Sequence, residues 1–371
     1  MQLLSTALLA LALAPAPRFN PGALIVADES QVAARRGTSH SAPRIAGASA
    51  ARVPAPAMRG AGPEAGKDKA LALMVLSSVP LAFGTFATAV QLAGALSDRE
   101  AVLLQCGTYG VATAGVLAMR LAREKTLRVR RATRRAGCEL GLWISIAATL
   151  QSLGLQRTTA ARAGFLVRLS TVIVPVAEAL HRGVLPSKRV VMASALSVVG
   201  VTLMTLAPGA LSSNASPLAS LWRGDALIAL AACVYSVHIL RLGVLAPRHD
   251  AWTMATAKAP TQLACSAAAL ACFRGPAARA PPLRTLAQVA CFTGLVTCAF
   301  PMWAQGFGQS RVRPTTASLI YASAPVVNAA VAAAVLGQHL SVRACLGASF
   351  MMAGMGLAVF DSLGPSPRRS L

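Results

Sequence analysis

The stretch ARAGFLVRLSTVIVPVAEAL, residues 161–180, decides the class of fold. A helix needs roughly 20 apolar residues to cross the hydrocarbon core of a bilayer, and this stretch supplies them. Arg168 stands near its middle, where a charged side chain costs at least about 2.5–3.5 kcal/mol on insertion scales. Intramembrane charges face the bundle interior or a water-filled space, so Arg168 is the first candidate functional residue.

The rest of the chain repeats this apolar pattern. Of its 371 residues, 55% are hydrophobic and only 13% are charged, whereas soluble domains carry about 25% charged residues. The apolar blocks lack the period-two alternation of strands. The sequence therefore predicts an all-α membrane protein with ten transmembrane helices, at residues 70–95, 101–121, 137–155, 162–180, 189–207, 223–245, 252–273, 286–307, 315–337 and 341–361.

The formal net charge of +23 raises the question of a nucleic-acid partner. The densest basic run, RLAREKTLRVRRATRR at 120–135, has no aromatic residue on which a base could stack. It lies between two apolar blocks, as the positive-inside rule predicts. Seventeen Lys and Arg fall on its side of the predicted bundle and eight on the other. We therefore expect no nucleic acid as a partner and both bundle ends on the cytoplasmic side.

The first 66 residues predict targeting rather than a folded domain. MQLLSTALLALALAPAP resembles the apolar core of a signal peptide, and residues 18–66 are rich in Ala, Ser, Pro and Arg, as in a transit peptide. This order resembles the two-part presequence of proteins in secondary plastids. It favours the plastid envelope; a disordered tail, with another endomembrane or the plasma membrane as the location, is the alternative.

The chain also carries an internal repeat at an offset of 154 residues. Gly154 aligns with Gly308, Gly183 with Gly337 and Gly200 with Gly354. Each unit holds five predicted spans, and an odd number inverts the second unit relative to the first. The predicted organisation is a first repeat at 67–207, a connecting loop at 208–222, a second repeat at 223–361 and a tail at 362–371.

Two segments resemble a known family. ELGLWISIAATLQSLGLQRTTAARAGFLVRLSTVIVPVAEAL, residues 139–180, and RPTTASLIYASAPVVNAAVAAAVLGQHLSVRACLGASFMMAGMGLAVF, residues 313–360, resemble parts of the two EamA repeats of the drug/metabolite transporter superfamily. The resemblance extends over about 70–361. It implies two inverted five-helix repeats and transport of small organic solutes by alternating access. Gln338 departs from the acidic residue that relatives commonly carry.

Catalytic and metal-binding motifs are missing from the sequence. It has no phosphate-binding Gly-rich loop, no HExxH and no CxxC among its eight cysteines. We therefore expect no enzyme activity, no catalytic residue, no cofactor and no metal site.

Polar residues inside the spans are the remaining candidates for a solute site. Arg168 could clamp an anion, because guanidinium matches carboxylate or phosphate, or it could form a structural ion pair with Glu139 or another helix. Lys258 could contribute, or it could extend its ammonium to the membrane interface. The other candidates, each open to a reading as packing or interhelical hydrogen bonding, are Gln151, Trp143, Tyr109, Tyr321, Asn328, Trp303 and His238.

The sequence as a whole predicts a carrier for a small organic, anionic metabolite in a lipid bilayer. A scaffold or receptor-like protein that keeps the fold without transport is the alternative, and a homodimer stays open.

Overall fold

The computed structural model describes residues 63–92, 96, 98–155, 157–158, 160–205, 218–272, 282–337 and 340–363. These residues belong to one compact unit, 59–371. Residues 1–62 of the predicted targeting segment lie outside the described residues, and so does Gln338. Every regular element within the described ranges is helical, which confirms the all-α prediction.

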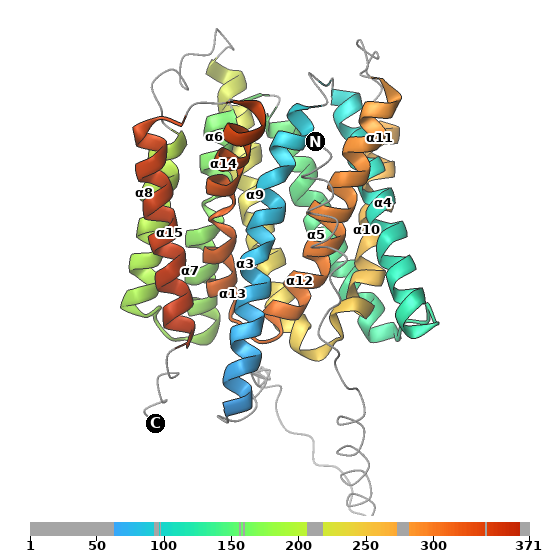
Figure 1. The fold of residues 1–371 in the computed structure, drawn as a ribbon, viewed down its shortest axis with the longest axis horizontal. Helices are drawn as coiled ribbons and strands as arrows, with labels where there is room; N and C mark the ends of the chain where they lie inside the picture. Colours follow the sequence, from blue (N-terminus) through green and yellow to red (C-terminus); the bar gives the residue numbers. More distant parts are fainter. Residues whose placement is uncertain are drawn as a thin grey trace, which may run out of the picture. The chain divides into compact units, whose positions relative to one another are not determined.

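The helices run along one common direction (Figure 1). The first half of the described chain contains α3 (Pro63–Gln91), α4 (Asp98–Glu124), α5 (Arg131–Leu155), α6 (Ala160–Val167), α7 (Ser170–Arg182) and α8 (Lys188–Thr205). The second contains α9 (Leu218–Leu245), the short η2 (Ala246–Arg248), α10 (Ala251–Cys272), α11 (Leu283–Phe292), the π-helical η3 (Thr293–Ala299), α12 (Phe300–Gln309), α13 (Pro314–Tyr321), α14 (Ala324–Leu336) and α15 (Val342–Leu363).

Each of the ten predicted apolar blocks coincides with one helix or one run of consecutive helices. Within the described ranges, nine of these segments are long and apolar enough to cross a membrane. The exception is the 22-residue α10, whose apolar content is diluted by Lys258, Gln262 and several hydroxyl side chains. The chain is thus a polytopic helical membrane protein, and its tenth span stays a prediction.

Helix boundaries follow the 154-residue offset found in the sequence. α6 ends at Val167 and α13 at Tyr321, and both helices are followed by a two-residue break before α7 and α14 begin. α7 and α14 end in the same way, at Gly183 with a φ of 66° and Gly337 with a φ of 65°. Glycine suits both positions because it adopts positive φ without the steric cost of a Cβ.

The equivalent helices α8 and α15 pack against each other in antiparallel orientation. On α8 and α15, a Cβ at Gly200 would lie 2.6 Å from the carbonyl oxygen of Gly347, and one at Gly354 would lie 2.8 Å from that of Ala193. From one contact to the next, the residue number rises by seven on α15, from 347 to 354, and falls by seven on α8, from 200 to 193. The two helices are therefore antiparallel. Small residues at these crossings allow the backbones to approach closely.

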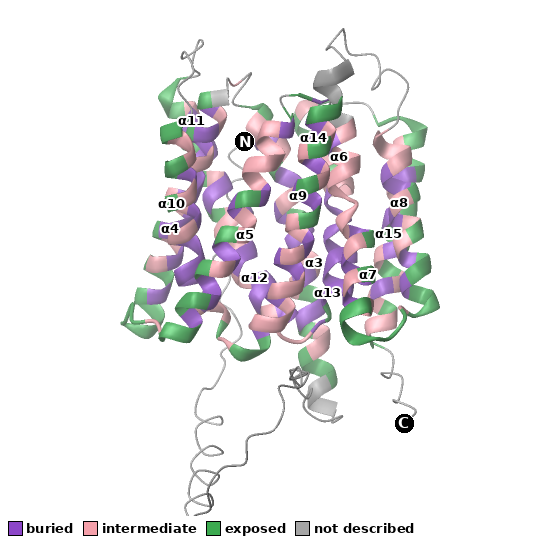
Figure 2. Cartoon of the chain, turned by 180° about the vertical axis from the view of Figure 1, so that it is seen from behind, coloured by how far each residue is buried: buried purple, intermediate pink, exposed green. Residues whose placement is uncertain are grey.

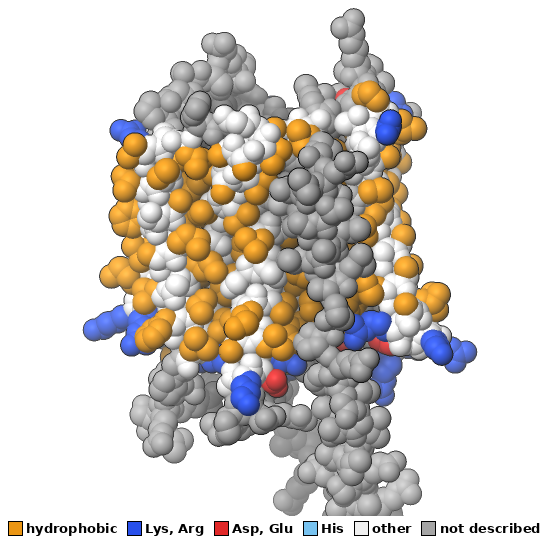
Figure 3. Space-filling model, viewed as in Figure 1, with side chains coloured by type: hydrophobic (Ala, Val, Ile, Leu, Met, Phe, Trp, Pro, Cys, Tyr) orange, Lys and Arg blue, Asp and Glu red, His pale blue; other side chains and the backbone are white. Residues whose placement is uncertain are grey.

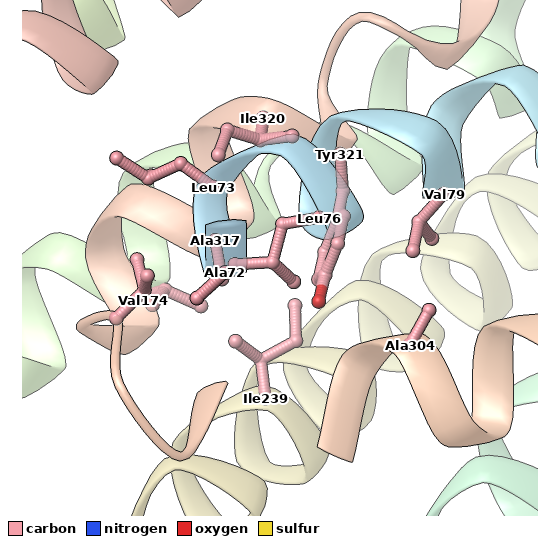
Figure 4. Packing of buried hydrophobic residues seen from close by; sticks show 11 residues of the cluster. Ala72, Leu73, Leu76, Val79, Val174, Ile239, Ala304, Ala317, Ile320 and Tyr321 are labelled. Carbon is pink, nitrogen blue, oxygen red and sulfur yellow. The ribbon is translucent and has the colours of Figure 1, made fainter. Parts of the chain in front are cut away.

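The interior is packed where α3 passes α13. Leu73, Leu76 and Val79 of α3 meet Ile320 and Tyr321 of α13, joined by side chains of α7, α9 and α12 (Figure 4). Buried residues face the inside of the bundle and exposed ones its outer faces and ends (Figure 2). Of the large exposed side chains, many are apolar, including Leu81, Leu142 and Phe350.

The charged side chains lie mainly outside this apolar surface. In Figure 3 the hydrophobic side chains form a broad band, and Lys and Arg gather mainly at one end, where the α4–α5 and α7–α8 loops lie. That distribution is expected for a protein whose outer surface faces lipid.

Candidate functional site

The centre of the candidate site is the break between α6 and α7. Val167 ends α6 and Ser170 begins α7, so Arg168 lies in the break itself rather than within a regular helix. At 1.5 Å per residue, it lies about 12 Å from the start of α6 and about 21 Å from the end of α7. Arg168 is thus deep within the bundle, as the sequence predicted.

Arg168 reaches across to the equivalent break in the other half of the protein. Its Nη1 donates a hydrogen bond of 3.0 Å to the carbonyl oxygen of Tyr321, the last residue of α13. The usual donor to that oxygen would be the N–H of residue 325, but Pro325 has none. A proline on α14 therefore leaves an acceptor to which the arginine of the other break can bind.

The guanidinium keeps unused hydrogen-bonding capacity. Its Nε is shielded from solvent and has no hydrogen-bond partner, and no carboxylate of the described residues lies within 4.0 Å of the group. The ion pair with Glu139 considered from the sequence is wrong. Glu139 accepts from Arg241 instead, at 2.5 Å from Nε and 2.9 Å from Nη2.

Tyr235 and the predicted residue Gln151 add neutral polar groups close to Arg168. Tyr235 on α9 lies near the guanidinium, and its hydroxyl donates a 2.8 Å hydrogen bond to Oε1 of Gln151 on α5. A phenol and an amide next to a cation can hydrogen-bond the oxygen atoms of a polar solute. The site therefore combines one charge with neutral hydrogen-bonding groups from several helices.

Lys258 occupies a second polar position, on α10. Its side chain is only 3% exposed, so the alternative of an ammonium extended to the interface is wrong. Its Nζ lies 3.3 Å from Nε2 of His238 on α9. The sequence predicted both residues as site candidates, and the fold brings them together.

The other predicted residues are distributed over the bundle. Tyr109 accepts a 3.4 Å hydrogen bond from Gln105, Asn328 accepts one of 3.4 Å from Thr88, and the Tyr321 hydroxyl accepts one of 3.2 Å from Gln309. Two of these hydrogen bonds join different helices, as the alternative of interhelical hydrogen bonding predicts, and the bond between Gln105 and Tyr109 lies within α4.

The two tryptophans lie apart from this polar centre. Trp303 stacks between Trp252 and Phe307, with ring centroids 5.5 Å from each, beside the basic end of the bundle. Trp143 interacts with Glu139 at the Glu139–Arg241 pair. Trp303 is thus part of an aromatic cluster, and its role in a solute site stays a prediction.

Sequence reasoning missed the role of two acidic residues. Oε2 of Glu178 accepts hydrogen bonds from N and Oγ1 of Thr315, at 3.0 and 2.6 Å, and so caps the N-terminus of α13 from α7. Asp225 of α9 accepts from Thr158 at 2.5 Å and from Arg162 just inside α6. No local signal marks either pair, because the partners are more than 60 residues apart.

No group of three or more His, Cys, Asp or Glu in the described ranges could hold a metal ion. Among the described residues, the candidate site combines cationic and neutral polar side chains, an arrangement that can bind an anion.

Comparison with known proteins agrees with this fold. A solved crystal structure aligns over 78% of this chain and 98% of its own, with a TM-score of 0.65 and 19% identity. At that identity the likeness shows a shared fold. A search of curated proteins gave no match.

These observations define a polytopic helical membrane protein with a polar, cationic interior. Residues 222–360 match the EamA-like transporter family. The match confirms, over this segment, the resemblance inferred from the sequence, and it suggests a membrane transporter.

Proposed function

We propose that the protein is a carrier for a small organic anion and that Arg168 binds the anionic group. The observation that carries the proposal is the guanidinium with an unpartnered, shielded Nε and no carboxylate of the described residues within 4.0 Å. Guanidinium has five N–H donors, and the bond to Tyr321 uses one of them. A carboxylate or phosphate supplies both the negative charge and the missing acceptors.

Alternating access between two inverted five-helix repeats is part of this proposal. The shared offset of 154 residues in helix ends, breaks and positive-φ glycines supports a repeat, and the antiparallel contact of α8 with its equivalent α15 supports inversion. The ten-span fold follows if α10, which packs beside α4 and α5, crosses with them. Arg168 and Tyr321 then join the two repeats at the break of each.

Transport by the purified protein tests the proposal. Proteoliposomes would be given four radiolabelled acids in parallel: pyruvate, succinate, glutamate and glycerol 3-phosphate. We expect saturable uptake of at least one acid, a loss of at least tenfold in Arg168→Gln, and partial recovery in Arg168→Lys, which keeps the charge without the planar fork.

Arg343→Gln is the matched control, because it makes the same change on an exposed arginine of α15. Arg168→Gln should still insert and fold, since it removes a costly buried charge. Uptake that survives in folded Arg168→Gln would contradict the anion site. No uptake of any acid by the parent protein would favour the scaffold alternative.

We also propose a plastid envelope location, on the composition of residues 1–66. A fusion of this segment to a fluorescent protein should enter the plastid of an alga with secondary plastids. Retention in the endoplasmic reticulum would contradict the location without affecting the carrier proposal.

A further inference from the structure

We infer that Lys258 and His238 form a proton-binding site, through which one proton moves together with each solute anion. The inference rests on the proposed carrier function and adds the coupling ion to it.

The two side chains make a buried pair with unusual chemistry. Nζ of Lys258 lies 3.3 Å from Nε2 of His238, and the side chains are 3% and 2% exposed. An ammonium in a membrane bundle ordinarily pairs with a carboxylate or with backbone carbonyls. Here its partner is an imidazole, which accepts the hydrogen bond only while that nitrogen carries no proton of its own.

Close helix packing encloses the pair. A Cβ at Gly141 of α5 would lie 2.8 Å from the carbonyl oxygen of Lys258, and one at Gly137 would lie 3.1 Å from its N. α5 therefore lies directly on the backbone of α10 at this residue. Bulk water does not compensate the charge there, so protonation depends on charges inside the bundle.

The surroundings supply no free negative charge. α4 presents Tyr109 and Arg120, and Nη1 of Arg120 donates to Thr256 at 3.3 Å, two residues from Lys258. η3 presents the thiol of Cys298 near Lys258. The nearby acid of α5 is Glu139, already paired with Arg241, and Cys138 on α5 is exposed. An ammonium at Lys258 is thus uncompensated by any carboxylate of the described residues within 4.0 Å.

A chain of polar groups links this pair to the proposed anion site. Tyr235, which lies near Arg168 and donates to Gln151, stands three residues before His238 on α9, so the two side chains are neighbours on one face of that helix. An anion bound at Arg168 therefore adds negative charge to the same polar interior. By linkage, anion binding and proton binding favour each other.

The proton balance is simple. The amine nitrogen of Lys258 takes a proton from water on the entry side as the anion binds, with its ammonium donating to Nε2 of His238. When the anion leaves on the other side, the ammonium returns the proton to water there. The repeat equivalents are Leu104 and Gly84, so the symmetry of the fold does not require this pair.

The test separates coupling from transport. Proteoliposomes containing the pH dye pyranine would be given the same four acids, first in exchange for internal unlabelled acid and then with the outside one pH unit more acidic. In the parent, we expect labelled acid to accumulate up to about tenfold, since one proton per anion transmits a tenfold difference in proton activity. The lumen should acidify as the acid enters.

In Lys258→Gln, accumulation normalised to exchange should fall from about tenfold to about one. Lys188→Gln, an exposed lysine at the start of α8, is the matched control and should keep the tenfold value. His238→Gln, which keeps a neutral acceptor that does not titrate, should shift the pH dependence of accumulation. If Lys258→Gln does not fold, the pH dependence of His238→Gln and the pyranine signal of the parent test the inference instead.

Two results would overturn the inference. Uptake by the parent without luminal acidification would exclude the proton, and an unchanged gradient response in folded Lys258→Gln would exclude the residue. Both leave the carrier proposal intact. Absence of uptake and exchange of all four acids by the parent would instead contradict the proposed function, and the inference with it.

Discussion

At the scale of single residues, charges inside this bundle bind to the backbone at helix ends. Arg168 donates to the last carbonyl of α13, and Glu178 accepts from the first N–H groups of the same helix. Both charges match the helix dipole, since a cation is favoured at the C-terminus and an anion at the N-terminus. The short α13 is thus held at both ends by the α6–α7 segment of the other half.

The Glu178 cap should contribute to stability. Glu178→Ala removes the carboxylate oxygen that accepts both hydrogen bonds from Thr315 and should cost about 0.5–2 kcal/mol, as for other helix N-caps. Thermal unfolding in detergent would measure it as a lower midpoint. Arg182→Gln is the control, because it removes only the exposed side of the 2.9 Å ion pair, worth about 0–1 kcal/mol. Equal midpoints for the two variants would contradict the cap.

Sequence reasoning could find Arg168 but not its partner. The depth of the residue follows from counting along an apolar block. The partner depends on Pro325, 157 residues later, which removes an N–H from a different helix. Glu139 was the natural candidate by charge, but its pairing with Arg241 is set by the packing of α5 against α9. Such long-range contacts follow from the fold and not from any local pattern.

At the scale of elements, the breaks in α6–α7 and α13–α14 are equivalent in position but differ in hydrogen bonding. In the first, Oγ of Ser170 donates to the carbonyl oxygen of Val167 at 3.0 Å. In the second, the equivalent carbonyl, that of Tyr321, depends on Arg168. The second break is therefore the one that a bound solute could change, by competing for the guanidinium.

Pro325→Ala should alter that break. It restores an N–H that can donate to the Tyr321 carbonyl, so α13 and α14 can join and Arg168 loses its acceptor. We expect anion uptake in proteoliposomes to fall severalfold while the thermal midpoint holds or rises. Pro80→Ala, in the unbroken α3, should change uptake little. Normal uptake in Pro325→Ala would show that the break is dispensable.

The crossing of α8 and α15 offers a second test at this scale. A Cβ at Gly347 would lie 2.5 Å from the carbonyl oxygen of Gly200, whereas one at Gly356 on the same helix meets nothing within 4 Å. Gly347→Ala should therefore cost about 1–3 kcal/mol by overpacking. Gly356→Ala should be neutral or stabilising, since alanine favours a helix. Their thermal midpoints should differ in that order, and a reversed order would exclude the close crossing.

At the scale of the whole molecule, the class of fold is readable from the sequence because the bilayer imposes length and polarity on every span. The blocks at residues 162–180 and 315–337 were predicted as single spans, and each is long and apolar enough to be one. The break that divides each into two helices was not predicted, because nothing in the apolar content reveals it. For α10, the composition obscures a span that the packing suggests. Its polar residues place it below the hydropathy of the other segments, although it packs among them.

Whether α10 crosses the membrane decides between ten spans and nine. If it crosses, Asp250 before it and Leu283 after the following loop lie on opposite sides. Single cysteines at these positions, in a variant that lacks the eight native cysteines, should react with a membrane-impermeant maleimide from opposite sides of sealed vesicles. Cysteines at Arg128 and Arg343 calibrate the basic end and the other end. Labelling of both test positions from one side would place α10 outside the spanning set, and the inverted repeat would then fail, because the second half would hold four spans against five.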